Sequence, residues 1–238
     1  MTEELFREDA ALEACDAVVT SRDERGIRLD RTVFYPQGGG QAGDRGELLL
    51  DDGRAIAIVD TKKGAEPGEI VHVPAPDQEA LLAELRPGAR VRARIDVERR
   101  RRHMRFHTAT HLLCALVPFQ TNGCSITRDY ARLDFDMVEP LEREHLDREL
   151  ARLVSEAHDV RTVWITDEEL DAKPELVRTM SVQPPHGVGR VRLLEIEGVD
   201  LQPCGGTHVA NTREIGAIRV AKIEKKSART RRVVLEFA

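Results

Sequence analysis

Two short motifs lie far apart in the chain, and each offers a pair of metal-ligand side chains. "HTATH" places His107 and His111 four residues apart, a spacing that puts both imidazoles on one face of a helix, about one turn apart. "PCGGTH" places Cys204 and His208 four apart, with two glycines that let the backbone fold both toward one point. Three imidazoles and one thiolate suit zinc. We therefore predict a fold that gathers these remote segments around one zinc ion.

The same motifs exclude one familiar zinc chemistry. A metalloprotease helix needs glutamate directly after its first histidine as the general base, and this chain has Thr108 there. The zinc would then serve either another kind of hydrolysis or a structural link between the two motifs. His103 lies one turn before His107, and we expect it at most to contact the ligand residues without binding zinc itself. The residues assign no general base.

A glycine-rich segment, "FYPQGGGQAGDRG", spaces Gly38, Gly40 and Gly43 as dinucleotide-binding loops do. Such a loop needs a helix that begins at its third glycine, because the helix N-terminus binds the phosphates. Here "ELLL" and "AIAIVD" follow instead, joined by an Asp-Gly turn, which predicts a β-hairpin. We expect no dinucleotide cofactor. The glycines form either a plain turn or a place where a ligand comes close to the backbone.

The sequence pattern changes from strand-like to mixed helix and strand at about residue 97. Short strand-like runs separated by Gly, Pro and Asp turns fill residues 1–96, as in "ARVRARID", and predict a small β-barrel that carries the glycine-rich loop. Helices are expected at about 97–117 and 139–158, among further strand-like runs. The predicted class is α+β: an N-terminal small β-barrel over 1–96, then an α+β zinc-binding domain over 97–238.

Composition bounds the kind of protein. No apolar run approaches the roughly 20 residues that span a bilayer, and the acidic N-terminus lacks a signal-peptide core, so we expect a cytoplasmic protein with no membrane partner. The formal net charge is −6, yet five arginines gather in "ERRRRHMR" and seven Lys or Arg in "RVAKIEKKSARTRR". This segregation allows a local positive face for phosphate contact, although ordinary solvated charge would give the same pattern.

Four sequence blocks carry a resemblance to a known family. "RFHTATHLL" and "GVDLQPCGGTHVANTREIG" resemble the paired ligand signature of the alanyl-tRNA synthetase editing domain. "TVFYPQGGGQAGDRG" resembles the glycine-rich segment that precedes that domain in the synthetases and in the free-standing AlaX trans-editing proteins. With "ARLDFD" and the basic C-terminal strand pair, the resemblance covers nearly the whole chain. The chain is similar to the medium-length AlaX form, which keeps the glycine-rich domain.

The resemblance implies a zinc-dependent aminoacyl-tRNA deacylase that acts in trans on alanine tRNA mischarged with serine, and possibly with glycine. Its Zn²⁺ would be held by His107, His111, Cys204 and His208. The residues it implies for substrate binding are Thr32, Gly38, Gly39, Gly40 and Gln41. Thr32 would sense the serine hydroxyl, since a site built to bond a hydroxyl rejects an amino acid without one. Otherwise Thr32 is an ordinary β-branched strand residue.

Binding of tRNA would use the basic C-terminal segment. The phosphate-contact candidates are Lys222, Lys225, Lys226, Arg229, Arg231 and Arg232. Recognition of the acceptor end should rest on shape, 2′-hydroxyls and the splayed 3′ nucleotides. Two other functions stay open: a non-catalytic tRNA-binding module with a structural zinc, and a zinc esterase acting on a small molecule.

Overall fold

A computed structural model describes residues 1–179, 187 and 189–238. The chain divides into two compact units. We call them the barrel unit, residues 1–38 and 42–101, and the C-terminal unit, residues 39–41 and 102–238. The sequence-based boundary at 96/97 falls at the start of a long helix, whereas the units part within that helix. Three residues of the glycine-rich loop belong to the C-terminal unit.

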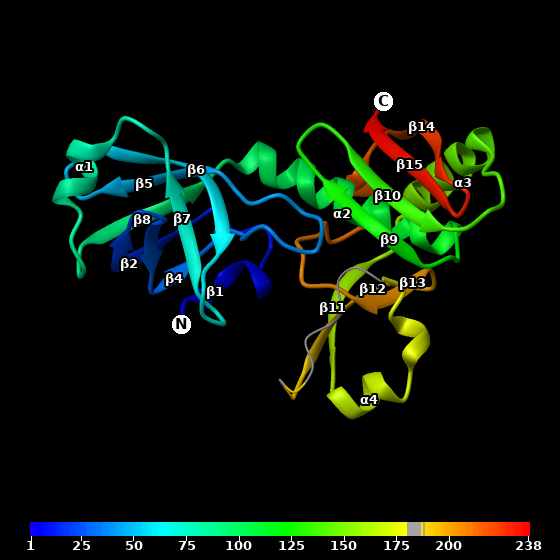
Figure 1. Ribbon diagram of the computed structural model, residues 1–238, viewed down its shortest axis with the longest axis horizontal. Coiled ribbons are helices and arrows are strands. Elements are labelled where there is room, and N and C mark those ends of the chain that lie inside the picture. The colour runs from blue at the N-terminus through cyan, green and yellow to red at the C-terminus, as the bar shows by residue number, and fades with distance from the viewer. Residues whose placement is uncertain (180–186, 188) are drawn as a thin grey trace. The chain divides into compact units, whose positions relative to one another are not determined.

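The barrel unit contains eight strands and two short helices. They are β1 (Glu3–Glu4), η1 (Leu5–Arg7), β2 (Ala14–Asp23), β3 (Gly26–Leu29), β4 (Arg31–Thr32), β5 (Gly46–Leu50), β6 (Ala55–Lys63), β7 (Ile70–Pro74), α1 (Glu79–Glu84) and β8 (Arg90–Ile95). Six of the strands close into a barrel in the order β2-β3-β7-β6-β5-β8 (Figure 1). The predicted barrel is confirmed.

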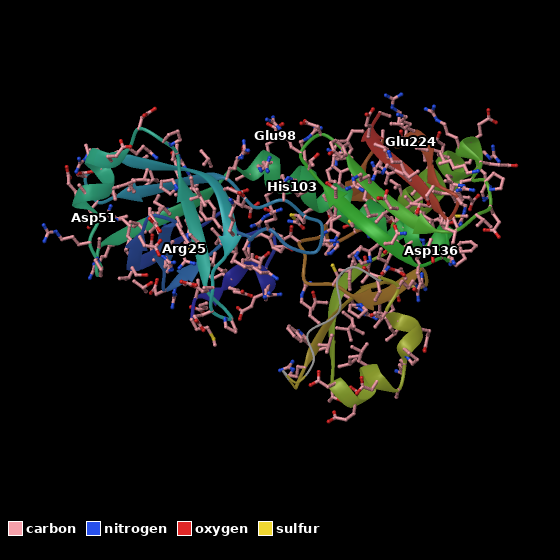
Figure 2. The ribbon with its side chains drawn as sticks, viewed as in Figure 1. Arg25, Asp51, Glu98, His103, Asp136 and Glu224 are labelled. Atoms are coloured by element: carbon pink, nitrogen blue, oxygen red, sulfur yellow. The ribbon has the colours of Figure 1, made fainter. Side chains whose placement is uncertain are left out.

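The barrel forms because its strands alternate apolar and charged residues. In β8, Val91, Ala93 and Ile95 are buried while the arginines between them are exposed. The predicted hairpin after the glycines is β5 paired antiparallel with β6, and its turn uses Gly53 at φ 85°, which a glycine adopts freely. The turn residues Arg25 and Asp51 carry exposed charged side chains (Figure 2). Strands β5 and β6, rather than a helix, follow the glycine-rich loop, as the sequence predicts.

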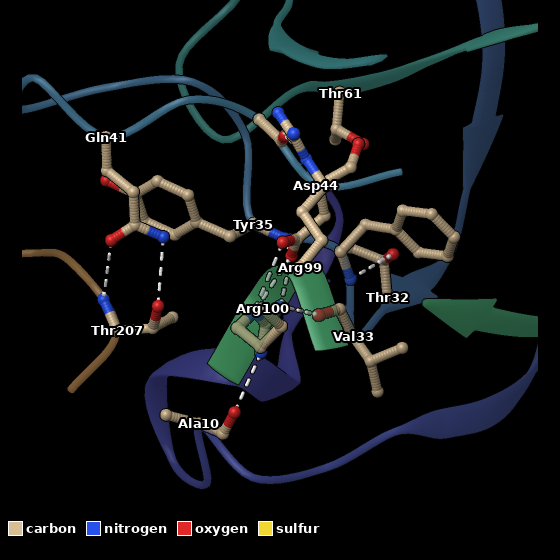
Figure 3. A network of polar contacts seen from close by, with 12 residues as sticks. Ala10, Thr32, Val33, Tyr35, Gln41, Asp44, Thr61, Arg99, Arg100 and Thr207 are labelled. Carbon is tan, nitrogen blue, oxygen red and sulfur yellow. Dashed lines mark hydrogen bonds and ion pairs between the residues drawn. The ribbon is translucent and has the colours of Figure 1, made fainter. Parts of the chain in front are cut away.

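A buried ion pair fastens the barrel to the first turn of the long helix. Arg100 and Asp44 are almost fully buried and bonded through both carboxylate oxygens. Arg100 also donates to the carbonyls of Ala10, at 2.8 Å, and Val33, at 2.6 Å (Figure 3). The Asp44 carboxylate accepts the backbone N–H of Tyr35 at 2.7 Å. The pair therefore satisfies backbone groups of two separate segments of this unit, one at Ala10 and one at residues 33–35.

The C-terminal unit is α+β, as predicted. Its elements are α2 (Val97–Leu116), which begins in the barrel unit, β9 (Thr121–Ile126), β10 (Ala131–Asp136), α3 (Arg143–Ser155), β11 (Val160–Ile165), α4 (Asp167–Asp171), η2 (Pro174–Leu176), β12 (Val191–Ile196), β13 (Asp200–Pro203), η3 (Thr212–Ile215), β14 (Ile218–Ser227) and β15 (Thr230–Phe237). The strands form two sheets, β14-β15-β10-β9 and β11-β12-β13 (Figure 1).

Helix α2 runs through the core of this unit. Nearly every residue from His103 to Cys114 is buried, which marks a helix enclosed on all sides. Phe106 stacks on Phe237 of β15, with ring centroids 4.0 Å apart. The helix expected at 139–158 is shorter, α3, and buries Leu146, Leu150 and Leu153. Among the described helices, none is long and apolar enough to cross a membrane.

One histidine makes the stability of the barrel depend on pH. His72 is fully buried, and burial lowers its pKa from 6.5 to about 4. The unfolded chain takes up this proton below pH 6.5, but the folded barrel does so only below pH 4. The barrel should therefore lose up to about 3 kcal/mol of stability as the pH falls from 6.5 to 4. Urea unfolding across this range measures the loss. His72→Asn should reduce this dependence of the unfolding free energy on pH, whereas His145→Asn, at an exposed position, should leave it unchanged. The same pH dependence in His72→Asn and the wild type would contradict the prediction.

Candidate metal centre

The two predicted motifs meet inside the C-terminal unit. Helix α2 places the rings of His107 and His111 5.5 Å apart, and the loop after β13 brings Cys204 and His208 against them. The four ligand atoms lie within 4.8 Å of one another. Cys204 Sγ is 3.5 Å from His107 Nε2 and 3.2 Å from His208 Nε2. Sulfur and nitrogen ligands of a tetrahedral zinc lie about 3.6 Å apart, so this donor set fits zinc.

A hydrogen bond behind His107 fixes its orientation. Gln41 is fully buried, and its Oε1 lies 2.8 Å from His107 Nδ1 and 3.2 Å from the backbone nitrogen of Thr207. Because a backbone N–H can only donate, the Gln41 atom facing both groups is oxygen. His107 Nδ1 therefore carries a proton, and its Nε2 is free to bind a metal. Gln41 Nε2 completes the arrangement by donating to Thr207 Oγ1 at 2.9 Å (Figure 3).

The other two imidazoles are held in the same way. His111 Nδ1 donates to Asp200 Oδ2 at 3.0 Å. Thr108 Oγ1 donates to the Met104 carbonyl at 3.0 Å, so it accepts from His208 Nδ1 at 3.2 Å. All three rings thus present Nε2 to the cluster. Metal-bound histidines are typically supported in this manner, and the residue that replaces the metalloprotease glutamate, Thr108, supports a ligand.

Charge distinguishes the ligand thiol from the other cysteines. Burial by itself would raise the pKa of Cys204, but His107 and His208 lower it well below its usual value. Burial raises the pKa of Cys114 and Cys124. Burial lowers the pKa of His111, but its hydrogen bonds and charge interactions with Asp200 and Cys204 together outweigh burial and raise that pKa to about 9, which makes His111 a more basic ligand. Cys204 is therefore the thiol best suited to bind a metal as thiolate.

Glycines let the two segments approach closely. A Cβ on Gly206 would lie 2.1 Å from His107 Cε1, so any larger residue would displace the ring. Gly40 has φ 85°, and a Cβ there would lie 2.6 Å from Cys124 Sγ. The Gly40 carbonyl accepts the backbone N–H of Ile126 at 2.7 Å. The loop residues 39–41 are thereby fixed to β9 and to His107.

The remaining predicted site residues lie in different places. Gln41 was expected to bind substrate, and the structure gives it a buried role behind His107. Thr32 and Gly38 belong to the barrel unit, where the Thr32 hydroxyl donates to His72 Nε2 at 2.8 Å and accepts from the Phe34 backbone at 3.0 Å. His103 is fully buried, and it is not one of the four residues of the cluster.

The predicted RNA-binding residues divide into two groups. Four are exposed: Lys222, Lys225, Lys226 and Arg229. Arg231 is buried and donates to the carbonyls of Val138 and Ser227. Arg232 is paired with both oxygens of Asp134, at 2.7 and 2.9 Å. Acidic Asp136 and Glu224 also lie in this sheet (Figure 2), and they pair with Arg229 and Lys222.

Sequence reasoning missed the residues that support the ligands. Asp200 and Thr207 were not singled out, and Thr108 was noted only as the residue that stands in place of a glutamate. Asp200 begins strand β13, which ends at Pro203, one residue before Cys204. In an extended chain, the even spacing of four residues puts both side chains on one face. That signal was available in "DLQPC". Thr108 and Thr207 gave none, because a threonine inside a motif indicates no particular partner.

Gln41 offers a direct test of this support. Gln41→Leu removes the acceptor of His107 Nδ1, and we expect zinc affinity to fall about 10- to 100-fold, the usual effect of losing such a partner. Competition with a chromophoric chelator measures the affinity. Gln37→Leu is the matched control, since Gln37 is exposed in the same glycine-rich segment. Equal zinc affinity of Gln41→Leu and the wild type would contradict the assigned role.

Comparison with known proteins covers both units. Residues 191–234 match the family described as "Threonyl and Alanyl tRNA synthetase second additional domain", and residues 7–99 match "tRNA synthetases class II (A)". "Alanyl-tRNA editing protein AlaX-M" of Methanosarcina acetivorans is 34% identical, with 98% of each chain covered. Its namesake in Saccharolobus solfataricus is 33% identical over 98% of each chain. "Alanine--tRNA ligase" of Metallosphaera sedula is 38% identical over 94% of this chain and 25% of the ligase.

Proposed function

Because the chain belongs to the AlaX family of alanyl-tRNA editing proteins, we propose that it hydrolyses, in trans, the ester joining a wrong amino acid to the 3′ end of alanine tRNA. We propose serine as that amino acid and glycine as a second substrate. The observation that carries this proposal is the convergence of His107, His111, Cys204 and His208, two of which lie within the matched synthetase domain. Such a cluster would hold zinc.

The residues around the cluster suit an ester substrate. A zinc ion bound there would supply a Lewis acid that polarises the ester carbonyl. The three histidines are buried, whereas Cys204 is partly exposed and Gly205 is exposed. An aminoacyl end would therefore approach on the Cys204 side. Gln41, Asp200 and Thr108 keep the imidazoles oriented while it binds.

The glycine-rich loop supports a close approach of the substrate. Gly39 has φ 58°, and among the described residues no atom lies within 4 Å of the position that its Cβ would occupy. This space leaves the backbone accessible beside the buried Gln41. We propose that the aminoacyl-adenosine lies along Gly38, Gly39 and Gly40. The role of Thr32 in sensing serine remains a prediction, and it would require the Thr32 hydroxyl to exchange or extend its bonds with His72 and Phe34.

We propose that the exposed basic residues of β14 and the β14–β15 turn contact tRNA phosphates. Lys225 and Lys226 are exposed near the end of β14, and Arg229 lies in the turn that follows. Phosphate contacts of this kind are sequence-independent and weaken with salt. Arg231 and Arg232 contribute less in this proposal, because their guanidinium groups hold the sheet together.

One observation favours a second candidate function. Four protein ligands are typical of a structural zinc, whereas a catalytic zinc normally keeps one position open. A tRNA-binding module with a structural zinc would bind the same RNA without cleaving the ester. It would also unfold when the metal is removed.

A deacylation assay distinguishes the two functions. Purified protein is mixed with alanine tRNA charged with serine, glycine or alanine, before and after metal removal and zinc readdition. The proposal predicts release of serine but not alanine, loss of release with a chelator, and recovery with zinc. Tight tRNA binding with no release from any charged tRNA would establish the second function instead.

A further inference from the structure

The only tryptophan of the chain lies on the surface of the C-terminal unit. Trp164 is on β11, and 44% of its surface is exposed. The core of this sheet does not need it. Val163, Ile165 and Leu193 pack beneath the sheet with Leu170 of α4. On the opposite face of β11, Trp164 and its neighbour Thr162 are exposed. An indole joins an apolar body to a polar N–H, and for this reason tryptophan is enriched at contacts with other molecules.

Strand register places Trp164 on the face that carries the metal centre. Trp164 is directly opposite Arg192 of β12, so the two side chains share one face. The backbone N–H of Cys204 donates to the Arg192 carbonyl at 3.1 Å. Trp164, Arg192 and Cys204 therefore lie side by side across the sheet, and we call these three residues the Trp164 row. Asp200 and Gln202 of β13, which support His111, lie on this face as well. Two strand spacings, about 10 Å, separate the Trp164 and Cys204 backbones.

One arginine lies over this indole, and a second is opposite it on β12. The guanidinium of Arg190 lies over the Trp164 ring, 5.0 Å from its centroid. Arg192 donates to the carbonyls of Cys204, at 2.7 Å, and Gly206, at 3.2 Å. The row therefore joins an aromatic surface, two cations and the metal-binding loop. Aromatic rings next to arginines are the surfaces on which proteins stack the bases of single-stranded RNA.

We propose that Trp164 and Arg190 form a stacking platform for an unpaired base at the 3′ end of the tRNA. This inference rests on the proposed function. The reacting ester belongs to the terminal nucleotide, so when it lies at the cluster an adjacent base must lie within a nucleotide's reach of it. The Trp164 row offers a stacking surface at that range, and Arg190 complements the negative phosphates. Stacking tolerates any base, so the platform would hold the strand without reading its sequence.

The single tryptophan makes this platform directly observable. The zinc-loaded wild type is titrated with the RNA tetranucleotide ACCA while its tryptophan fluorescence is recorded. We expect saturable quenching, because a base stacked on the indole quenches it. The control is an abasic oligonucleotide of the same length, which carries the sugar-phosphate backbone but no bases. It should leave the fluorescence unchanged. No quenching by ACCA at concentrations that inhibit deacylation would overturn the platform.

A variant pair measures its contribution to the reaction. Trp164→Leu should raise the KM for serine-charged alanine tRNA about 10- to 100-fold, the range expected for the loss of one stacked base, and leave kcat nearly unchanged. Trp164→Phe should restore most of the affinity. Phe119→Leu is the control, since Phe119 is an exposed aromatic of the same unit. Zinc content and thermal melts check that each variant is folded.

The outcomes separate the platform from the proposed function. If the wild type deacylates and Trp164→Leu keeps its KM, the platform is wrong and the editing function stands. If the wild type releases no amino acid, the proposed function is wrong. Quenching by ACCA would then support the platform as part of an RNA-binding module, and its absence would overturn that as well.

Discussion

Cys204→Ala is expected to lose zinc and deacylase activity together. It removes the only sulfur of the four-ligand cluster and the anion that balances the charge of a bound zinc. Losing a supporting residue already weakens metal binding about 10- to 100-fold, so losing a ligand should weaken it by more than about 100-fold. Release of serine should fall to the rate of the uncatalysed ester.

The comparison for this variant is Cys15→Ala. Cys15 is a partly buried free thiol on β2 in the barrel unit, so its loss should leave zinc content and turnover unchanged. Zinc per chain after dialysis and serine release by both variants provide the measurements. Undiminished turnover by Cys204→Ala would contradict the assignment of a catalytic metal to this cluster.

Arg100→Ala is expected to destabilise the barrel unit by about 3 to 5 kcal/mol. Breaking one partner of a buried pair leaves the other charge buried and uncompensated, here the carboxylate of Asp44. The carbonyls of Ala10 and Val33 lose their donor in the same substitution. Urea unfolding followed by circular dichroism measures the effect.

A neighbouring arginine supplies the control for Arg100→Ala. Arg101 is 70% exposed in its pair with Glu13, and Arg101→Ala should change stability by no more than about 0.5 kcal/mol. A double variant, Arg100→Met with Asp44→Asn, should lose less than the sum of the single variants, because neither charge is left alone. Equal losses of stability in Arg100→Ala and Arg101→Ala would contradict the prediction, because they would show that the buried pair contributes no more than an exposed one.

Local sequence patterns were enough to predict the barrel and to single out the four residues that the structure gathers into one cluster. Alternation in β8 and the Asp-Gly turn between β5 and β6 are properties of a few adjacent residues. The four-residue spacing of His107 and His111 is likewise local to α2. The convergence of α2 with the loop at Cys204 could be expected from chemistry, because the four side chains together make a zinc donor set.

Tertiary contacts decided what the sequence could not predict. Arg100 and Arg231 looked like members of basic clusters, yet each is buried among carbonyls or carboxylates of distant segments. Gln41 lies in a loop that we expected to face a ligand. Gly40 turns the backbone there, and the side-chain amide of Gln41 bonds to His107. Such roles depend on partners many residues away, which no local pattern specifies.

X-ray absorption of the zinc-loaded protein tests the central claim most directly. The spectrum of bound zinc reports the number and kind of its ligand atoms. We predict one sulfur at about 2.3 Å and three imidazole nitrogens at about 2.0 Å. The sulfur signal should be kept in Cys15→Ala and absent from any zinc that Cys204→Ala still binds at raised zinc concentration. A shell of oxygen ligands, or a sulfur signal that survives in Cys204→Ala, would contradict the account.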